Sequence, residues 1–121
     1  MTYFKIIKLD ATPSTNNYLK NKYKSRDAKD GDLVWTKNQT SGRGQRENTW
    51  FSKPGESLTF SIFRQYKDIN ILNPFILSIL VSLGIHEALS TIHLPNLKIK
   101  WPNDILSCNK KVGGILIENF F

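Results

Sequence analysis

The 121-residue sequence predicts one α+β domain, with a mixed, mainly antiparallel sheet and helices packed on one face. Short stretches that alternate between apolar and polar residues, such as residues 57–63, are typical of half-buried strands. A long apolar segment that begins at Asn73 and Pro74 is typical of a core helix. Seven Phe, four Tyr and three Trp supply bulky core residues, which argues against intrinsic disorder.

In the first half of the chain, residues 3–9 and 31–37 are predicted strands on either side of a short helix. Ser14 is the expected N-cap of that helix, and its apolar contacts are Tyr18, Leu19 and Tyr23. Residues 38–55 are polar, contain three glycines and lack periodicity, so we expect a long functional loop. Residues 57–63 form the next strand, with one face made of Leu58, Phe60 and Ile62.

In the second half, a helix is expected from Asn73 to about Ile92, and it should be largely buried because it is apolar on most sides. Strands are predicted at residues 97–101, 104–108 and 112–118, the last two joined by a turn at residues 109–111. The chain then ends on three residues, Asn119, Phe120 and Phe121. We therefore expect that this is a truncated domain with further strands missing. The alternative is a terminal core strand with a frayed end.

The net charge suggests an anionic partner. With 17 Lys and Arg against 10 Asp and Glu, the formal charge is +7 and the isoelectric point is near 9.6. Such a surface attracts nucleic acid, nucleotides or phosphorylated small molecules. The alternative is that many of these lysines are ordinary solvated residues, as we expect for Lys20, Lys22 and Lys24.

Other features indicate the compartment. The single cysteine, Cys108, cannot form an internal disulfide, which suits a reducing environment. The longest apolar stretch, residues 75–85, is shorter than the roughly 20 residues of a membrane span. The N-terminus lacks the pattern of a secretion signal. We expect a cytoplasmic protein with no membrane partner.

The first motif with chemical potential is Gln39-Thr40-Ser41-Gly42-Arg43-Gly44-Gln45-Arg46. Glycines let a backbone approach a ligand closely, and arginine adds bidentate contacts to phosphate or carboxylate groups. The Gly-Lys-Ser/Thr ending of a P-loop is absent. A flexible basic loop and an RNA-binding turn therefore remain open alternatives.

Two further motifs lie near the C-terminus. Lys100-Trp101-Pro102-Asn103-Asp104 presents oxygen ligands that suit Mg²⁺ with phosphate, although an Asn/Asp turn that caps its own backbone is the commoner use of such a pair. Lys110-Lys111-Val112-Gly113-Gly114-Ile115-Leu116 places two lysines before two glycines. Glycines expose strand backbone to a ligand, and an ordinary hairpin is the alternative.

Together these motifs resemble biotin protein ligase over essentially the whole chain. The resemblance rests on Ser14-Thr15-Asn16, on Gly42-Arg43-Gly44-Gln45-Arg46 followed by Trp50, and on the two C-terminal motifs, in that family's order. It implies a catalytic domain similar to class II aminoacyl-tRNA synthetases and biotin synthetases. Residues 1–121 would then be the N-terminal portion of that domain, without a DNA-binding domain.

The resemblance implies a reaction and its site residues. Biotin and MgATP would give biotinyl-5′-adenylate, and biotin would then pass to a lysine of a carboxylase's biotin carrier domain. ATP, biotin and Mg²⁺ are the expected cofactors, no DNA is bound, and a homodimer is one option. Residues implied to bind biotin are Ser14, Thr15, Asn16, Gln39, Gly42, Arg43, Lys111, Gly114 and Leu116. Residues implied to bind ATP or the adenylate are Arg43, Gly44, Arg46, Trp50, Lys100, Asn103, Asp104 and Lys111.

Lys111 and Arg43 would carry the catalysis. Lys111 would lie between the biotin carboxylate and the α-phosphate, and Arg43 against the adenylate phosphate. Asp104 is the one candidate Mg²⁺ ligand. Such a site works by positioning and electrostatics. Gln45 and Glu47 depart from the family's loop, where a basic residue and a glycine are frequent.

Three other readings stay open. A lipoate or octanoate ligase shares the chemistry but needs an apolar tunnel in place of a polar ring pocket. A nucleic-acid-binding module would use Arg43, Arg46, Lys110 and Lys111, and its affinity would fall steeply with salt. An inactive fragment would keep the motifs without completing the site.

Overall fold

The computed structural model describes residues 3–66 and 73–120. The chain divides into two compact units, Met1–Lys67 and Asp68–Phe121, which are described separately. The described elements are β1 (Lys5–Thr12), α1 (Thr15–Lys24), β2 (Asp32–Gln39), β3 (Gly42–Arg43), β4 (Thr49–Trp50), β5 (Thr59–Ile62), α2 (Pro74–Ser90), β6 (Leu97–Lys100), β7 (Asp104–Ser107) and β8 (Lys110–Gly114). This confirms the α+β class.

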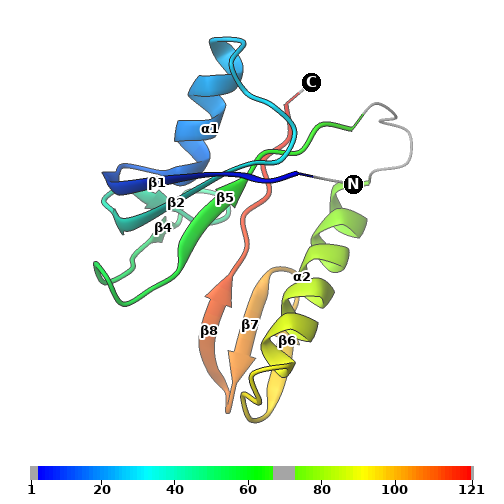
Figure 1. The fold of residues 1–121 in the computed structure, drawn as a ribbon. Helices are drawn as coiled ribbons and strands as arrows, with labels where there is room; N and C mark the ends of the chain where they lie inside the picture. The colour runs from blue at the N-terminus through cyan, green and yellow to red at the C-terminus, as the bar shows by residue number, and fades with distance from the viewer. Residues whose placement is uncertain (1–2, 67–72, 121) are drawn as a thin grey trace. The chain divides into compact units, whose positions relative to one another are not determined.

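The first unit contains a mixed three-stranded sheet in the order β1-β2-β5 (Figure 1). The parallel strands β1 and β2 are connected through α1, because parallel neighbours need a crossover, and β5 runs antiparallel to β2. α1 packs on β2 and β5. Its core residues are Leu19 and Val34, with Thr36 beside them, all buried.

Helix α1 begins where the sequence predicts. Ser14 has an extended backbone, and its Oγ accepts a hydrogen bond from the Asn17 N–H at 3.1 Å. This satisfies one of the free amides of the first turn. The strands flanking α1 are also present, although each continues beyond its predicted end, to Thr12 and Gln39 respectively.

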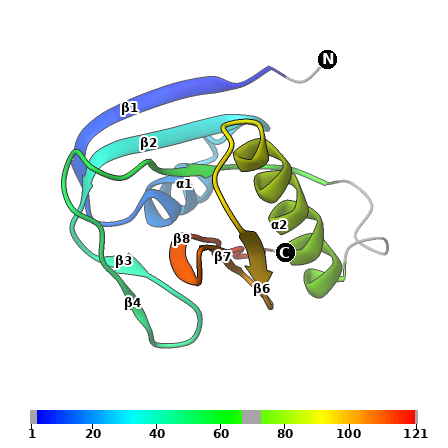
Figure 2. The ribbon, with the colours of Figure 1, turned by 90° about the horizontal axis from the view of Figure 1, so that it is seen from below.

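The predicted loop of residues 38–55 contains a hairpin. β3 pairs with β4 through Gly42 opposite Trp50 and Arg43 opposite Thr49, and Figure 2 shows the two strands extending beyond the end of β2. The Gly44 N–H donates to the Asn48 carbonyl at 2.8 Å. The expectation of an irregular loop is therefore wrong for these residues, since two-residue strands are too short to show alternation.

The second unit contains α2 and an antiparallel sheet in the order β6-β7-β8. Asn73 caps α2, accepting the Phe75 N–H at 2.9 Å, as predicted. The expectation that this helix is largely buried is wrong in the described structure, where Phe75, Ile76, Leu80 and Leu83 are exposed. α2 contacts β6 and β7, and three short strands can cover only one side of an apolar helix.

The hairpin of the second unit turns earlier than predicted. The turn residues are Cys108 and Asn109, both with positive φ (50° and 62°), as two-residue hairpin turns require. Lys110 and Lys111 therefore belong to β8, which ends at Gly114. The predicted hairpin is present, but its turn lies one residue earlier than residues 109–111, and the predicted strand at residues 112–118 coincides with β8 only at residues 112–114. No helix among the described residues is long and apolar enough to cross a membrane.

Candidate functional site

The sequence-predicted residues fall into two groups, one in each unit. The first group gathers around the N-terminus of α1, where Ser14 and Thr15 are both 3% exposed. The second lies on β6, β7 and β8 and in the segments that follow them.

Four neutral side chains form what we call the α1 polar cluster: Thr15, Asn16, Gln39 and Ser61. Gln39 Oε1 accepts the Thr15 N–H at 2.9 Å and the Thr15 hydroxyl at 3.3 Å. The hydroxyls of Thr15 and Ser61 lie 2.7 Å apart, and the Ser61 hydroxyl also bonds to Asn16 Oδ1. Amide and hydroxyl groups in such a cluster can both donate and accept hydrogen bonds. The cluster is therefore suited to a neutral polar group that does both.

Ser61 is the member of this cluster that the sequence prediction missed. It lies on β5 between Phe60 and Ile62, which are both more than 40% exposed, whereas Ser61 and Thr59 are partly buried. The polar side of this alternating strand contributes to the cluster with α1, and its apolar side does not. The alternation was visible in the sequence, but it does not show which residues of other elements Ser61 faces. Identifying Ser61 as a member of the cluster also requires the position of α1.

Gly42 provides the space that Gln39 occupies. A Cβ at Gly42 would lie 2.5 Å from Gln39 Nε2 and 2.6 Å from the Trp50 carbonyl oxygen, so a side chain there would displace both. Arg43 and Gly44 are partly buried on the same hairpin, and Arg46 is exposed in its turn. Trp50 pairs with Gly42 and is partly buried. These residues share the β3–β4 hairpin, which the sequence prediction of an irregular loop did not include.

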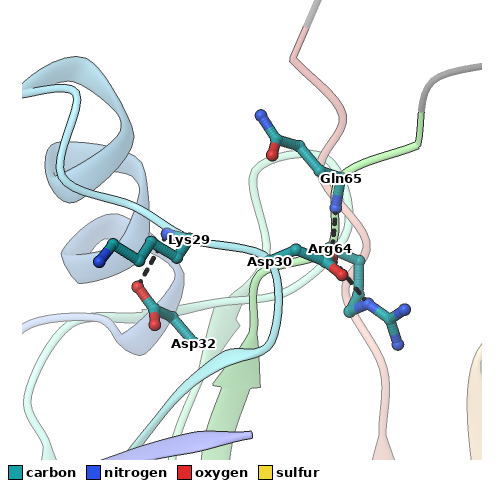
Figure 3. Close-up of polar contacts among 5 residues, drawn as sticks. All are labelled: Lys29, Asp30, Asp32, Arg64 and Gln65. Carbon is teal, nitrogen blue, oxygen red and sulfur yellow. Dashed lines mark hydrogen bonds and ion pairs between the residues drawn. The ribbon is translucent and has the colours of Figure 1, made fainter. Parts of the chain in front are cut away.

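Two aspartates, Asp30 and Asp32, make polar contacts at the start of β2 (Figure 3). Burial of Asp32 raises its pKa, but the Lys29 N–H at 3.0 Å and Lys22 Nζ at 3.3 Å outweigh this effect, and the pKa lies below its ordinary value. The Gln65 N–H at 2.7 Å, together with Arg64 Nε at 2.9 Å, lowers the pKa of Asp30. Lys22 is thus not the solvated residue that we expect from the sequence.

The second group lies on one face of the antiparallel sheet, which we call the lysine face: Lys98, Lys100, Asp104 and Lys111. The register places Lys98 and Lys111 on either side of Leu106, and Lys100 directly opposite Asp104. Residues directly opposite each other in a sheet share a face. The opposite face carries Ile105 and Ser107, both buried. Lys98 is a further candidate that the sequence prediction did not single out.

The lysine face combines three ammonium groups with one carboxylate. Lys111 Nζ lies 2.9 Å from Asp104 Oδ1, with the lysine side chain 43% exposed and the aspartate 22% exposed. Ammonium groups around a short sheet attract phosphates and carboxylates. This face is therefore suited to an anion.

Asn103 binds the backbone of the segment that follows β8. Its Nδ2 donates to the Ile115 carbonyl at 2.9 Å, and the Ile115 N–H donates to the Asn103 carbonyl at 3.0 Å. These two bonds fix the chain directly after Gly114, and Leu116 follows, partly buried. Asn103 therefore binds backbone 12 residues away, which differs from the alternative of a turn that caps its own backbone.

The donor set does not form a resident metal centre. Among the residues that the structure describes, no group of three or more His, Cys, Asp or Glu side chains could hold a metal ion. Asp104 is already paired with Lys111. Mg²⁺ is commonly bound through substrate phosphates with one or two protein carboxylates, so the magnesium role of Asp104 stays a prediction.

Comparison with known proteins identifies relatives. A model of the biotin/lipoate A/B protein ligase family matches residues 9–121. The bifunctional ligase/repressor BirA of Escherichia coli (strain K12) is 32% identical over 110 residues, which cover 91% of this chain and 33% of that protein. A biotin–[acetyl-CoA-carboxylase] ligase of Paracoccus denitrificans is 34% identical over 88 residues, covering 71% of this chain and 36% of that protein.

Solved structures agree with this match. Biotin acetyl coenzyme A carboxylase synthetase from Helicobacter pylori, with bound biotinylated ATP, has a TM-score of 0.86 at 30% identity, covering 98% of this chain and 56% of that one. Biotin protein ligase from Aquifex aeolicus, with biotin and ATP, has a TM-score of 0.81 at 32% identity, covering 97% of this chain and 47% of that one. The chain spans about a third of the length of the curated relatives that it matches. The chain belongs to the biotin/lipoate A/B protein ligase family.

Proposed function

We propose that this chain acts in a biotin protein ligase. Biotin and MgATP give biotinyl-5′-adenylate and pyrophosphate, and the biotinyl group then passes to a lysine of a carboxylase's biotin carrier domain. The observation that carries this proposal is the family match over residues 9–121, supported by structural relatives that contain biotin and ATP or biotinylated ATP.

The α1 polar cluster is the proposed site for the biotin head. The ureido ring offers two N–H donors and one carbonyl acceptor, and a matched set of buried polar groups discriminates strongly against ligands that lack them. Thr15, Asn16, Gln39 and Ser61 supply both kinds of group. Ser14 supports them as the cap of α1, and backbone at Gly42 completes the proposed contacts of this unit. The biotin contacts of Gly114 and Leu116 stay predictions from the family resemblance.

The β3–β4 hairpin is the proposed site for the adenylate. Arg43 and Arg46 would contact its phosphate, with backbone at Gly44 beside them and Trp50 near the nucleotide. The proposal is supported by the positions of these four residues on one short hairpin. A hairpin held by only two residue pairs can reorganise around a ligand at low cost.

Lys111 and Lys100 are proposed to hold the reacting anions. A carboxylate oxygen of biotin forms a bond to the α-phosphorus while the bond from that phosphorus to pyrophosphate breaks. Biotin and ATP are both negatively charged, so bringing them together requires fixed cations. Asn103 would support this side through its two bonds to Ile115. Mg²⁺ would enter with ATP as part of that substrate.

In the second step, the attacking amine belongs to the partner protein. It forms an amide with the biotinyl carbonyl carbon, AMP leaves with the electron pair of the broken mixed-anhydride bond, and the amine loses a proton. We propose a carboxylase carrier domain as the acceptor because a relative is named for acetyl-CoA-carboxylase. The absence of DNA binding, the cytoplasmic location and the homodimer stay predictions.

The first test is a calorimetric titration of the chain with biotin, with lipoate as the control. Saturable binding of biotin alone, followed by release of pyrophosphate on addition of MgATP, would support the proposal. Binding of lipoate in preference to biotin would contradict it in favour of the other branch of the family. A folded chain that binds neither ligand would contradict the proposal for this length of protein.

A further inference from the structure

The lysine face contains a contact that the proposed reaction does not by itself explain. Lys111, the residue proposed to hold the reacting anions, makes a 2.9 Å ion pair with Asp104 of the neighbouring strand. Asp104 is also the carboxylate for which the sequence suggests a metal role. The ion pair uses Oδ1 of Asp104, and the geometry of the hairpin shows how Lys111 comes to reach it.

The turn fixes the face on which Lys111 lies. Because only Cys108 and Asn109 form the turn, Ser107 pairs with Lys110 and Leu106 pairs with Lys111. Side chains two residues apart on a strand share a face, so Lys111 shares the face of Leu106 and Asp104. A turn with one more or one fewer residue would place Lys111 on the buried face with Ile105 and Ser107.

A bulge then leaves space for the lysine to reach the aspartate. The register shifts between Ile105 and Leu106, so that Val112 is an extra residue on β8 and Gly114 lies opposite Asp104. Glycine has no side chain to fill the position across from the carboxylate. Bulges often redirect side chains beside functional sites. Here the long lysine side chain reaches diagonally over this position to Asp104.

We infer that Asp104 is a positioning residue for Lys111, holding its ammonium group beside the glycine backbone of β8 before substrates bind. This inference rests on the proposed function and adds a residue role to it. Lysine loses considerable rotamer freedom when its ammonium group is fixed, and a group positioned in advance does not incur that cost during the reaction. The pair is partly exposed, so it contributes little to stability. Its main effect is on where the ammonium group lies.

The inference predicts opposite effects on binding and on chemistry. In Asp104→Asn, Lys111 loses one anion that competes with the biotin carboxylate for its ammonium group, so the KM for biotin stays the same or falls. The ammonium group is no longer fixed for the transition state, so kcat for adenylation falls by about tenfold or more. The KM for MgATP and the Mg²⁺ dependence stay unchanged, because Asp104 does not hold the metal.

Two further variants make the comparison quantitative. Asp104→Glu keeps the carboxylate and recovers part of kcat, since lysine is flexible enough to follow it. Glu56→Gln is the matched control, because it also removes a carboxylate that pairs with a lysine: Glu56 Oε2 lies 3.9 Å from Lys53 Nζ. Neither residue is a predicted site residue, so we expect kcat and KM to stay unchanged. All three variants keep the melting temperature of the starting chain within a few degrees.

A readout that does not depend on catalysis completes the test. In chain labelled with ¹⁵N-lysine, an ammonium group held by a carboxylate exchanges slowly enough to be observed by NMR, and Lys111→Arg assigns the signal. We expect Asp104→Asn to remove the Lys111 signal and Glu56→Gln to keep it. A Lys111 signal that survives in Asp104→Asn would overturn the inference.

The remaining outcomes separate the inference from the proposed function. Recovery of Asp104→Asn by excess Mg²⁺, with a raised KM for MgATP, would overturn the positioning role and make Asp104 a metal ligand. An unchanged kcat would overturn it as well. A starting chain that neither binds biotin nor forms adenylate contradicts the proposed function, while the NMR comparison still decides whether Asp104 fixes Lys111.

Discussion

The α1 polar cluster and the lysine face handle polar chemistry in different ways. The cluster is neutral and joins residues far apart in sequence through hydrogen bonds, with Thr15 almost fully buried. The lysine face is charged, arises from three consecutive strands and keeps Lys111 43% exposed. Neutral groups can be buried once they are hydrogen-bonded, whereas an ammonium group needs water or a counter-ion. In the proposed ligase, this difference separates recognition of the biotin head from handling of the reacting anions.

The largest expected effect comes from removing the principal cation. Lys111→Ala should lower kcat for adenylation by about 10³-fold, since its contact with the phosphate grows as charge develops. Biotin binding should weaken by less than about tenfold, because the neutral cluster stays intact. Single-turnover adenylation and calorimetry measure the two quantities. Equal losses in both would show that Lys111 binds the ground state and transition state alike.

The next effect concerns a buried charge in the first unit, outside the α1 polar cluster. Asp32 is 2% exposed and paired with Lys22, so Asp32→Asn should lower the free energy of unfolding at pH 7 by about 2–3 kcal/mol. The pKa of Asp32 is depressed in the folded state. Its stabilisation is therefore present above the ordinary carboxyl pKa and is lost as the pH falls through the depressed value.

Urea unfolding of Asp32→Asn and the starting chain, compared at pH 7 and below about pH 4, tests this assignment. The difference in the free energy of unfolding between Asp32→Asn and the starting chain should be smaller at the lower pH. Asp30→Asn is the control, because Asp30 pairs with Arg64 at an exposed position and its loss should cost less than about 1 kcal/mol. A gap that is independent of pH would contradict the role given to the carboxylate of Asp32.

A smaller effect should follow from filling the space beside the neutral cluster. In Gly42→Ala, the added Cβ would meet Gln39 Nε2 at 2.5 Å, so the Gln39 amide must shift relative to Thr15. Biotin affinity should fall by about tenfold or more, as expected for a disturbed set of buried hydrogen bonds. Gly55→Ala is a stability control, since Gly55 has open space around its Cβ position but a φ of 75°. Affinity unchanged in Gly42→Ala would place biotin away from Gln39.

The smallest effect uses salt to distinguish the two regions. Raising the ionic strength from about 0.05 to about 0.5 M should raise the KM for MgATP several-fold, since exposed charges are screened. The affinity for biotinamide, which lacks the carboxylate, should change by less than about twofold because the α1 polar cluster is neutral. Equal salt sensitivity for both ligands would mean that charged residues also bind the biotin head.

Features set by neighbouring residues could be predicted from the sequence. The caps Ser14 and Asn73 each bind an amide two or three residues away, so local sequence was sufficient to place both helix starts. The motif that contains Gly42 and Arg43 was also visible in the sequence, although the hairpin that carries it was not predicted. The family resemblance came from the order of such motifs, and the match over residues 9–121 confirms it.

Features that depend on register or on distant partners could not be predicted. The turn was placed one residue late because Asn109-Lys110-Lys111 is a plausible polar turn, and only pairing between Ser107 and Lys110 identifies the actual one. Ser61 joins the cluster through residues 45 and 46 positions away. The exposure of α2 depends on how much sheet covers it, which periodicity along the helix does not determine.

The two-residue turn at Cys108 and Asn109 imposes a parity rule on this hairpin. When the number of residues between Asp104 and Lys111 changes by two, both side chains stay on one face of the sheet. A change by one places them on opposite faces unless a bulge compensates. Alignments of related chains should therefore show gaps of even length here. A relative with an odd gap and no compensating bulge must bring its cation to the reaction from another strand.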